Sequence, residues 1–361
     1  MLMKRSQRVH LDTMTAAPPK TGKFTTLKEV AAAAGVSPMT VSNYVNGRHD
    51  LMSAEVRERV SDAVARLNYR SNNAARNLRK SQILSIGMII VDNSPVYLAD
   101  GYTTQIVAGV SNYLTEHGYS LLLQGIRPND FEKSRLIRDL QTDGLFVMLS
   151  GENSVRHTQF DTLRRLGQPL VIFMESFDGN NDFVCAIKQD EFAAGSMIAE
   201  HVMIRQPKSA VILVPQLNIW AAVLERERGM RAVLEPSLGV DGVSTLACSD
   251  GGFDDVQSAM FARFKDVGLP DAVLCINDQM AIAAVKSIRA VGAQVPLDVQ
   301  VTGFNAFDYH RYAEPELTTM RSFAYDMGVC GAKEMLNRLH RGKFDQQEIV
   351  FPFEFIRGES T

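Results

Sequence analysis

The chain of 361 residues is longer than one hydrophobic core usually supports, which predicts two or three domains. A hydrophobic content of 45% is ordinary for a globular protein, and no apolar run reaches the roughly 18 residues of a membrane span, which excludes a membrane-spanning class. Residues 1–80 hold 14 Lys and Arg against 6 Asp and Glu, whereas the remainder hold 24 against 35, so a polyanionic partner is expected for the N-terminal part only.

The four cysteines are scattered, with no CxxC spacing and no histidine partner at a ligand spacing. They are Cys185, Cys248, Cys275 and Cys330, and the pattern predicts buried structural thiols in a reducing cytosol rather than a metal or catalytic site. Residues 1–23 are basic without an apolar core of signal-peptide length, and their TAAPPKTGK segment is typical of disorder. We therefore expect a cytoplasmic protein without a metal or a cofactor.

A first helix is expected to begin after Thr26, because the threonine hydroxyl can cap it and Glu29 three residues later completes a capping box. Apolar residues then recur at helical spacing at Leu27, Val30, Ala31 and Ala34. Gly35 supplies a turn, and Ser37-Pro38 restarts the chain as the cap and first residue of a second helix.

The second helix has a small apolar face, where Val41 and Val45 stack one turn apart. Its polar residues and one methionine then face outward, at Met39, Ser42, Asn43 and Asn46. Two short helices, a tight glycine turn and an outward polar face predict a helix-turn-helix whose second helix enters the DNA major groove. The alternative is an ordinary helical hairpin inside an α domain.

A third helix, capped by Ser53, completes an all-α domain over residues 24–70. Its inner stripe is Val56, Val60, Val64 and Leu67. The segment 71–82 is polar and basic, with too few apolar residues to fold alone. It is interpreted either as a solvated linker or as a short helix that forms against a partner.

From residue 83 the pattern becomes one of apolar strand-like runs separated by helix-length segments. The seven runs are SIGMIIV, YSLLLQG, DGLFVML, PLVIFME, SAVILVP, DAVLCIN and VQVTGF. Such alternation predicts βαβ units with parallel sheets covered on both faces, and seven runs favour two halves with a cleft between them. No GxGxxG or Walker A motif is present, so the phosphate loop of nucleotide-binding folds is missing.

At this point the chain resembles the lactose-repressor family of bacterial transcription regulators, from about residue 25 to residue 361. The motif T-L-K-E-V-A-x-x-A-G-V-S-x-x-T-V-S-x-x-x-N-G begins at Thr26. The body adds INDQMA at 276–281, P-x-D-V-x-V-x-G-F at 296–304, PELTT at 315–319 and a closing RGEST.

The resemblance implies a helix-turn-helix head with a hinge helix, joined to a two-lobed α/β core like that of periplasmic sugar-binding proteins. We expect the head at 24–70, the hinge at 71–82, and the core at 83–361. Within the core, the first lobe is expected at about 83–184 and 320–342, and the second at about 185–319 and 343–361. The chain is expected to cross between the lobes three times.

The resemblance also implies that two copies bind near-palindromic operator DNA as a homodimer, with a tetramer as the alternative. The residues expected to contact DNA are Thr26, Leu27, Ser37, Met39, Thr40, Ser42, Asn43, Asn46, Tyr69, Asn72, Ala75 and Leu78. Leu78 is expected to wedge into the minor groove. Asn43 replaces an arginine of many members, which predicts reading of adenine N6 and N7; contact with phosphate or water alone is the alternative.

A small-molecule effector, a sugar or related polyol, is expected between the lobes. Arg226 matches a family arginine that forks onto ligand hydroxyls or carboxylates, with a surface helix arginine as the alternative. Asn277 matches a ligand-contacting residue, and Asp278 beside it either shares that role or caps the next helix. Asp92 ends the first core strand, where open α/β sheets place their ligands.

Three further residues are expected at the effector site. Asn305 stands where the family most often has an aspartate that grips sugar hydroxyls, so the identity of the polyol is open. The loop 93–99 is longer than the common form and brings Tyr97 beside the cleft. Trp220 either stacks on an effector ring or has a buried structural role.

The leading hypothesis is thus a ligand-switched repressor. A periplasmic-type sugar receptor without a DNA role shares the core, but the basic head and the missing signal peptide argue against it. Catalysis is not expected, because no motif groups a nucleophile with a base. Whether the effector releases the protein from DNA or promotes binding is open.

Overall fold

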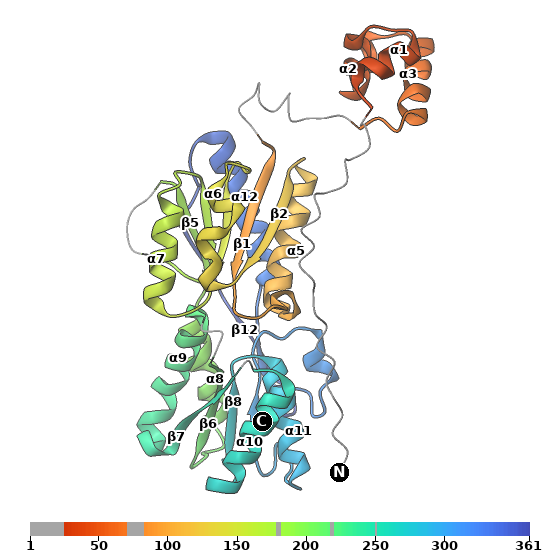
Figure 1. The fold of residues 1–361 in the computed structure, drawn as a ribbon. Coiled ribbons are helices and arrows are strands. Elements are labelled where there is room, and N and C mark those ends of the chain that lie inside the picture. Colours follow the sequence, from red (N-terminus) through yellow and green to blue (C-terminus); the bar gives the residue numbers. More distant parts are fainter. Residues whose placement is uncertain (1–24, 71–82, 178–181, 217–219, 250) are drawn as a thin grey trace, which may run out of the picture. The chain divides into compact units, whose positions relative to one another are not determined.

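The computed structural model describes residues 25–70, 83–177, 182–216, 220–249 and 251–361 (Figure 1). The chain divides into two compact units, Met1–Ser81 and Gln82–Thr361, here called the head and the body. The predictions of disorder at 1–23 and of a hinge at 71–82 lie outside the described residues. Within the described part of the chain, no helix combines the length and the apolar character needed to cross a membrane.

Residues 25–70 of the head form three α-helices, α1 (Leu27–Ala34), α2 (Pro38–Val45) and α3 (Ala54–Arg66), with a short 3-10 helix at His49–Leu51. The predicted capping box is present, because Thr26 Oγ1 accepts from Glu29 N and the Glu29 carboxylate accepts from Thr26 N. Gly35 then adopts a left-handed φ of 64°, which favours glycine and turns the chain toward α2. The predicted helix boundaries in the head are therefore confirmed.

The core of the head is small and is made from the predicted apolar faces. Its buried members are Val30, Ala31, Ala34, Val41, Val60 and Ala63. Short side chains let the three helices approach closely, which fixes the orientation of α2 within the head.

The described residues of the body form twelve strands. They are β1 (Ser85–Val91), β2 (Ser120–Ile126), β3 (Leu145–Leu149), β4 (Leu170–Phe173), β5 (Val184–Gln189), β6 (Ala210–Pro215), β7 (Val243–Cys248), β8 (Ala272–Cys275), β9 (Gln300–Thr302), β10 (Thr319–Arg321), β11 (Glu348–Phe351) and β12 (Glu354–Ile356). Its α-helices are α5 (Gly101–Glu116), α6 (Arg135–Arg138), α7 (Asn153–Arg164), α8 (Glu191–Met203), α9 (Ala221–Leu238), α10 (Phe253–Val267), α11 (Asp278–Ala290) and α12 (Ala324–Arg341). Short 3-10 helices occur at Tyr97–Ala99, Pro128–Lys133, Val240–Gly242 and Asp308–Tyr312.

The first lobe is a parallel sheet in the order β11-β5-β4-β3-β1-β2. Alternate residues of β1 face opposite sides: Met88 packs with α5 and α12, and Ile89 packs with α6 and α7. Both faces are covered, so the central strands are apolar along their whole length. This explains why the SIGMIIV run coincides with β1.

The second lobe is a smaller parallel sheet in the order β7-β6-β8-β9. Helices α8 and α9 pack together, as do α10 and α11, and the two pairs flank this sheet (Figure 1). The predicted class, two parallel α/β lobes, is thus confirmed.

The predicted lobe boundaries are wrong at two places. β5 pairs with β4, and β11 pairs with β5, so residues 184–189 and 348–351 belong to the first sheet and not to the second lobe. The chain leaves the first lobe after β5, returns between β10 and α12, and leaves again between β11 and β12. The antiparallel pair β10–β12 lies at these crossings, and Figure 1 shows β12 between the two sheets.

The cysteines follow the prediction in part. Cys185, Cys248 and Cys275 are buried, whereas Cys330 on α12 is half-buried. Burial raises the pKa of the Cys275 thiol well above its usual range, so this side chain behaves as a neutral apolar group.

Helices α8 and α9 cross at glycines, and this crossing bears directly on the site. A Cβ on Gly195 of α8 would lie 2.3 Å from the carbonyl oxygen of Arg226, and one on Gly229 of α9 would lie 2.1 Å from that of Phe192. The two backbones can therefore approach only because these side chains are absent. The approach brings Glu191, one turn before Gly195, beside Arg226.

Candidate functional site

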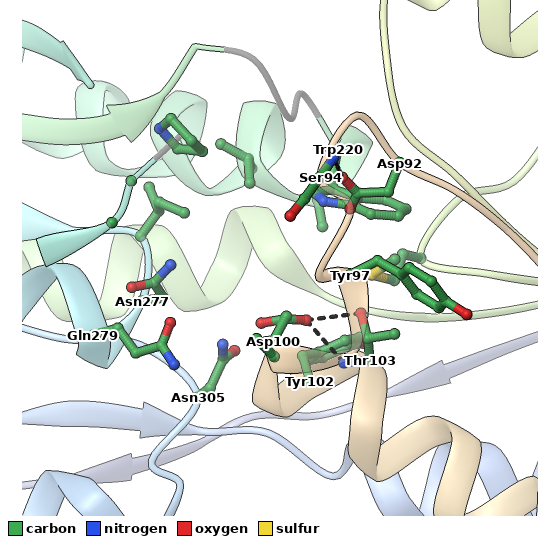
Figure 2. A pocket seen from close by; sticks show the side chains of 18 of the residues that line it. Asp92, Ser94, Tyr97, Asp100, Tyr102, Thr103, Trp220, Asn277, Gln279 and Asn305 are labelled. Carbon is green, nitrogen blue, oxygen red and sulfur yellow. Dashed lines mark hydrogen bonds between the residues drawn. The ribbon is translucent and has the colours of Figure 1, made fainter. Parts of the chain in front are cut away.

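A cavity of about 270 Å³ lies between the two lobes of the body (Figure 2). The six effector residues predicted from the sequence all line it: Asp92, Tyr97, Trp220, Arg226, Asn277 and Asn305. The first lobe supplies the first two from the loop after β1, and the second lobe supplies the other four. A molecule in this cavity therefore contacts both lobes.

The wall from the first lobe is acidic. Asp92 follows β1, and its Oδ1 accepts a hydrogen bond of 2.7 Å from Ser94 N. Asp100 caps α5, where its Oδ2 accepts from Thr103 N and Thr103 Oγ1, both at 2.8 Å (Figure 2). Burial raises the pKa of Asp92 to about 6; the Ser94 N–H lowers it, and the nearby charge of Asp100 adds to the rise.

Arg226, on α9, is buried, with only 4% of its surface exposed, so the alternative of a surface arginine is wrong. Its Nε and Nη2 donate to Glu191 at 2.5 and 3.2 Å, and its Nη1 donates to the carbonyl oxygen of Ile276 at 2.8 Å. The guanidinium also lies over the ring of Phe304, 4.1 Å from the centroid.

The Nε and Nη2 donors of Arg226 are already bonded to Glu191 and do not form an unoccupied fork for a ligand. Glu191 occupies one edge of the guanidinium and cancels its charge within the protein. Burial raises the pKa of Glu191, and the Arg226 cation acts in the opposite direction. A carboxylate that accepts two N–H donors from an arginine is best described as the ionised half of a buried ion pair.

Amides from the second lobe face the acidic wall. Asn277 caps α11, since its Oδ1 accepts from Met280 N at 2.8 Å, and this leaves its NH₂ group for other partners. The capping role offered to Asp278 therefore belongs to Asn277. Gln279 is exposed within the same wall, and Figure 2 shows the Asn277 and Gln279 side chains on the side of the cavity opposite Asp92.

Asp278 lies behind the cavity wall. It is fully buried, and its Oδ1 accepts a 2.6 Å hydrogen bond from Thr319 Oγ1 at the start of β10. Burial raises the pKa of Asp278 to about 7, against the lowering effect of the Thr319 hydroxyl and backbone N–H groups. This carboxyl group joins the ligand-facing helix α11 to a strand at the lobe crossing.

Asn305 is held in a left-handed conformation, with φ of 97°, which asparagine tolerates better than most residues. Its backbone is fixed to the crossing segment, because its N–H donates to Met320 O and its carbonyl accepts from Ser322 N. Its side chain is 4% exposed and lines the cavity, yet its Oδ1 has no hydrogen-bond partner within the described residues. An unpartnered buried acceptor in a cavity wall is a group that a ligand can satisfy.

The two predicted aromatic residues have different positions. Trp220 lines the cavity and also packs against the apolar cores of both lobes, so it has a structural role, and stacking on an effector ring stays a prediction. The ring of Tyr97 covers Gly125, where a Cβ would lie 2.1 Å from Tyr97 Cε1, and Figure 2 shows its hydroxyl directed away from Asn277. Tyr97 therefore supplies wall area rather than a polar contact.

In the head, several predicted DNA contacts are also structural. Thr26 and Ser37 are caps, Leu27 and Tyr69 pack against the core, and the Ser37 hydroxyl meets that of Thr40 at 2.9 Å. The Asn46 amide donates to the carbonyl oxygen and the hydroxyl of Ser42.

The outward face of α2 leaves two side chains available. Met39 is 69% exposed, and the amide of Asn43, one turn later, makes no hydrogen bond to any described residue. The apolar side chain of Met39 and the amide of Asn43, on the second helix of a helix-turn-helix, are suited to contact the edges of DNA bases. Asn72, Ala75 and Leu78 lie outside the described residues.

Sequence reasoning missed part of the cavity wall. Asp100 and Gln279 line it, as do Ser94, Tyr102 and Thr103. The signal for Asp100 was present, because an aspartate before the helical stretch GYTT is a typical cap, and Gln279 belongs to the quoted INDQMA motif. No described group of three or more His, Cys, Asp or Glu residues could hold a metal ion.

Two family models match the chain. Residues 26–72 match the model of bacterial regulatory proteins of the lacI family, and residues 221–361 match the periplasmic binding protein-like domain. The first contains the whole helix-turn-helix, and the second begins at α9 and covers most of the second lobe.

Curated relatives extend over nearly the full chain. The transcriptional repressor PurR of Haemophilus influenzae is 30% identical over 330 residues, which is 89% of this chain and 94% of the relative. Catabolite control protein A of Staphylococcus aureus is 28% identical over 333 residues, covering 91% of this chain and 96% of the relative.

Solved structures share the fold of this chain. The Lac repressor bound to ONPG in its repressed state has a TM-score of 0.78 at 23% identity, covering 94% of this chain and all of that one. The CelR–cellobiose complex has a TM-score of 0.66 at 25% identity, covering 93% and 100%. From the lacI-family head, the two-lobed body and a 30% identical relative matched over almost its full length, we conclude that the chain belongs to the lacI family of bacterial regulatory proteins and is a DNA-binding transcription regulator.

Proposed function

We propose that this regulator is a repressor whose affinity for operator DNA is switched by a small polyhydroxylated molecule bound between the lobes. The observation that carries the proposal is the cavity shared by both lobes, because a ligand that contacts both changes the relative stability of their arrangements. Hydrogen-bonding groups line opposite walls: Asp92 and Asp100 on one, Asn277, Gln279 and Asn305 on the other. Trp220 adds an apolar surface of the kind that sugar rings stack upon.

On the DNA side, we propose that α2 reads the major groove through Met39 and Asn43. Two copies of the chain would place two heads on a near-palindromic operator, as a homodimer or as a tetramer. The solved Lac repressor dimer bound to operator and the anti-inducer ONPF, and the CelR–cellobiose complex, support this combination of partners. A protein that acts on DNA in this way would work in the bacterial cytoplasm.

The proposal is tested with the full chain and an operator obtained by selection from random DNA. Fluorescence anisotropy then measures operator affinity with and without each member of a panel of sugars and polyols. We expect at least one to change operator affinity on the order of tenfold or more, as is typical of allosteric coupling. A panel without any effect on operator binding would contradict the switch.

Two matched variants, each replacing an exposed glutamine by alanine, test whether the active sugar binds in this cavity. Gln279→Ala removes an exposed amide from the cavity wall, whereas Gln105→Ala removes an exposed amide from α5 that does not line the cavity. Both should keep the operator affinity of the ligand-free protein. Only Gln279→Ala should weaken the response to the active sugar, and an equal response in both variants would place the ligand elsewhere.

A further inference from the structure

The cavity contains one cationic side chain among its described lining residues, and that cation is already paired. Arg226 shares a bidentate ion pair with Glu191, in which both side chains are about 5% exposed, and it also donates to Ile276 O. Glu191 is not among the residues that line this cavity. A ligand therefore meets a guanidinium whose charge is already balanced by Glu191.

The carboxylates of the opposite wall have no such balance. Asp92 accepts one backbone N–H and Asp100 accepts two donors from Thr103, but all of these donors are neutral. Neither aspartate has a salt bridge among the described residues. The charge of Asp100 contributes to the raised pKa of Asp92, so the two carboxylates of this wall act on each other. With Arg226 paired to Glu191, this wall thus carries two carboxyl groups without a cationic partner among the described residues.

Asn305 adds an independent observation. Its Oδ1 is a buried acceptor without a described partner, in the same cavity and 4% exposed as a residue. Figure 2 shows the side chain directed between Gln279 and Asp100. Like the two carboxylates, this oxygen needs a hydrogen-bond donor from the ligand and repels another acceptor.

We infer that this cavity selects its ligand by charge: it takes a neutral or cationic molecule that donates hydrogen bonds through hydroxyl or amino groups, and it excludes carboxylated and phosphorylated sugars. Asp92 and Asp100 are the specificity-determining residues, and Glu191 is a positioning residue that prevents Arg226 from attracting an anion. The inference rests on the proposed function of the cavity. It replaces the expectation that Arg226 forks onto a ligand carboxylate.

The physical reason is the field inside a partly closed cavity. Like charges in a protein repel more strongly than in water, since the effective dielectric constant near 20 is well below that of bulk solvent. The anionic group of such a ligand would also place a further acceptor, and no donor, against the aspartates and the Asn305 oxygen. A hydroxyl or ammonium group satisfies the same acceptors.

The test uses a small-molecule extract of bacterial cells, separated by ion exchange into anionic, neutral and cationic pools. Each pool is added to the full-length protein, and the melting temperature is measured for wild type and for Gln279→Ala. We expect stabilisation of wild type, reduced in Gln279→Ala, by the neutral or the cationic pool. Such stabilisation by the anionic pool would overturn the charge selection but leave the proposed function intact. No stabilisation by any pool would overturn the proposed function, and the inference with it.

A second arm tests the residues. The active molecule is identified by mass spectrometry, and its carboxylated or phosphorylated derivative is titrated by calorimetry into wild type and into the Asp92→Asn, Asp100→Asn double variant. Asparagine keeps the shape, and at position 100 it also keeps the helix cap. The anionic derivative should bind the double variant on the order of tenfold or more tightly than wild type. Equal or weaker binding by the double variant would refute the role of the two aspartates.

Discussion

The buried ion pair between Arg226 and Glu191 predicts a large and unusual mutational effect. Arg226→Met preserves most of the side-chain volume but removes the guanidinium. The substitution eliminates two hydrogen bonds to Glu191 and one to Ile276 O, and it leaves a carboxylate that is about 6% exposed without a counter-ion. Breaking a buried pair in this way costs about 3–5 kcal/mol of folding free energy.

A double variant distinguishes the effect of the unpaired charge from the effect of altered packing. Replacing both residues, as Glu191→Gln with Arg226→Met, removes the charge together with its counter-ion. Because a buried ion pair spends much of its attraction on desolvation, the double variant should lie within about 2 kcal/mol of wild type. The single variant should therefore be the less stable of the two.

The assay is urea unfolding followed by the fluorescence of Trp220, which is the only tryptophan and belongs to the body. Removing the arginine raises the pKa of Glu191 further, and a raised pKa contributes stability that is present at low pH and lost as the pH rises through it. The Arg226→Met defect should thus be smaller at pH 5 than at pH 8. A loss below about 1 kcal/mol, or a loss independent of pH, would refute the reasoning. Since the variant alters folding, loss of a ligand response in it would not by itself show ligand contact.

Three further outcomes are expected. Asn43→Arg should move the preferred operator at one symmetric position toward guanine, by about 1–3 kcal/mol per bidentate contact, and an unchanged sequence after selection from random DNA would count against base reading. Gly195→Ala should destabilise the body by about 1–3 kcal/mol, because its Cβ would lie 2.3 Å from Arg226 O; urea unfolding as stable as wild type would show that α8 and α9 can separate without cost. Asp92 and Asp278 have folded pKa values of about 6 and 7 against an ordinary 3.8, so their contribution to stability is complete below the ordinary value and lost as the pH rises through 6 and 7. The unfolding free energy should accordingly fall from pH 5 to pH 8. Asp278→Asn should reduce that fall by on the order of 2 kcal/mol. If the variant has the same pH profile as wild type, Asp278 is not the titrating group.

The head was predictable because its signals are local. Thr26 with Glu29, the glycine at position 35, and Ser37 before Pro38 each act within one turn of the residue concerned. Their effect does not depend on the rest of the fold, so the helix limits could be derived from the sequence alone.

The body was predictable where a strand carries a continuous apolar run, as in the buried strand β1 and in the mostly unburied edge strand β2. The edge strands β7 and β11 were missed: β7 is buried only at its two ends, and β11 has no buried position. β5 lies inside the sheet, but its Lys188 and Gln189 interrupt the apolar run. Missing β5 and β11 also produced the error in the lobe boundaries.

The site, too, was predictable only in part. Family positions, a strand end, a loop and an aromatic residue together identified six residues that meet in one cavity, although they come from segments up to 213 positions apart, Asp92 to Asn305. The partner of Arg226 was not foreseeable, because Glu191 is 35 positions away and reaches it only through the glycine crossing of α8 and α9. Pairing across helices is a tertiary property that spacing cannot express.

The threefold crossing of the chain has a consequence for synthesis in the cell. The first sheet takes its edge strand β11 from residues 348–351, and the second lobe takes β12 from residues 354–356, so each lobe needs a segment from the last part of the body. A ribosome must therefore release nearly the entire chain before either lobe can close, while the head can fold as soon as its own helices emerge. During that interval the unpaired edge of β5 is open to association with other nascent chains, and folding helpers that shield it should affect the yield of the body more than that of the head.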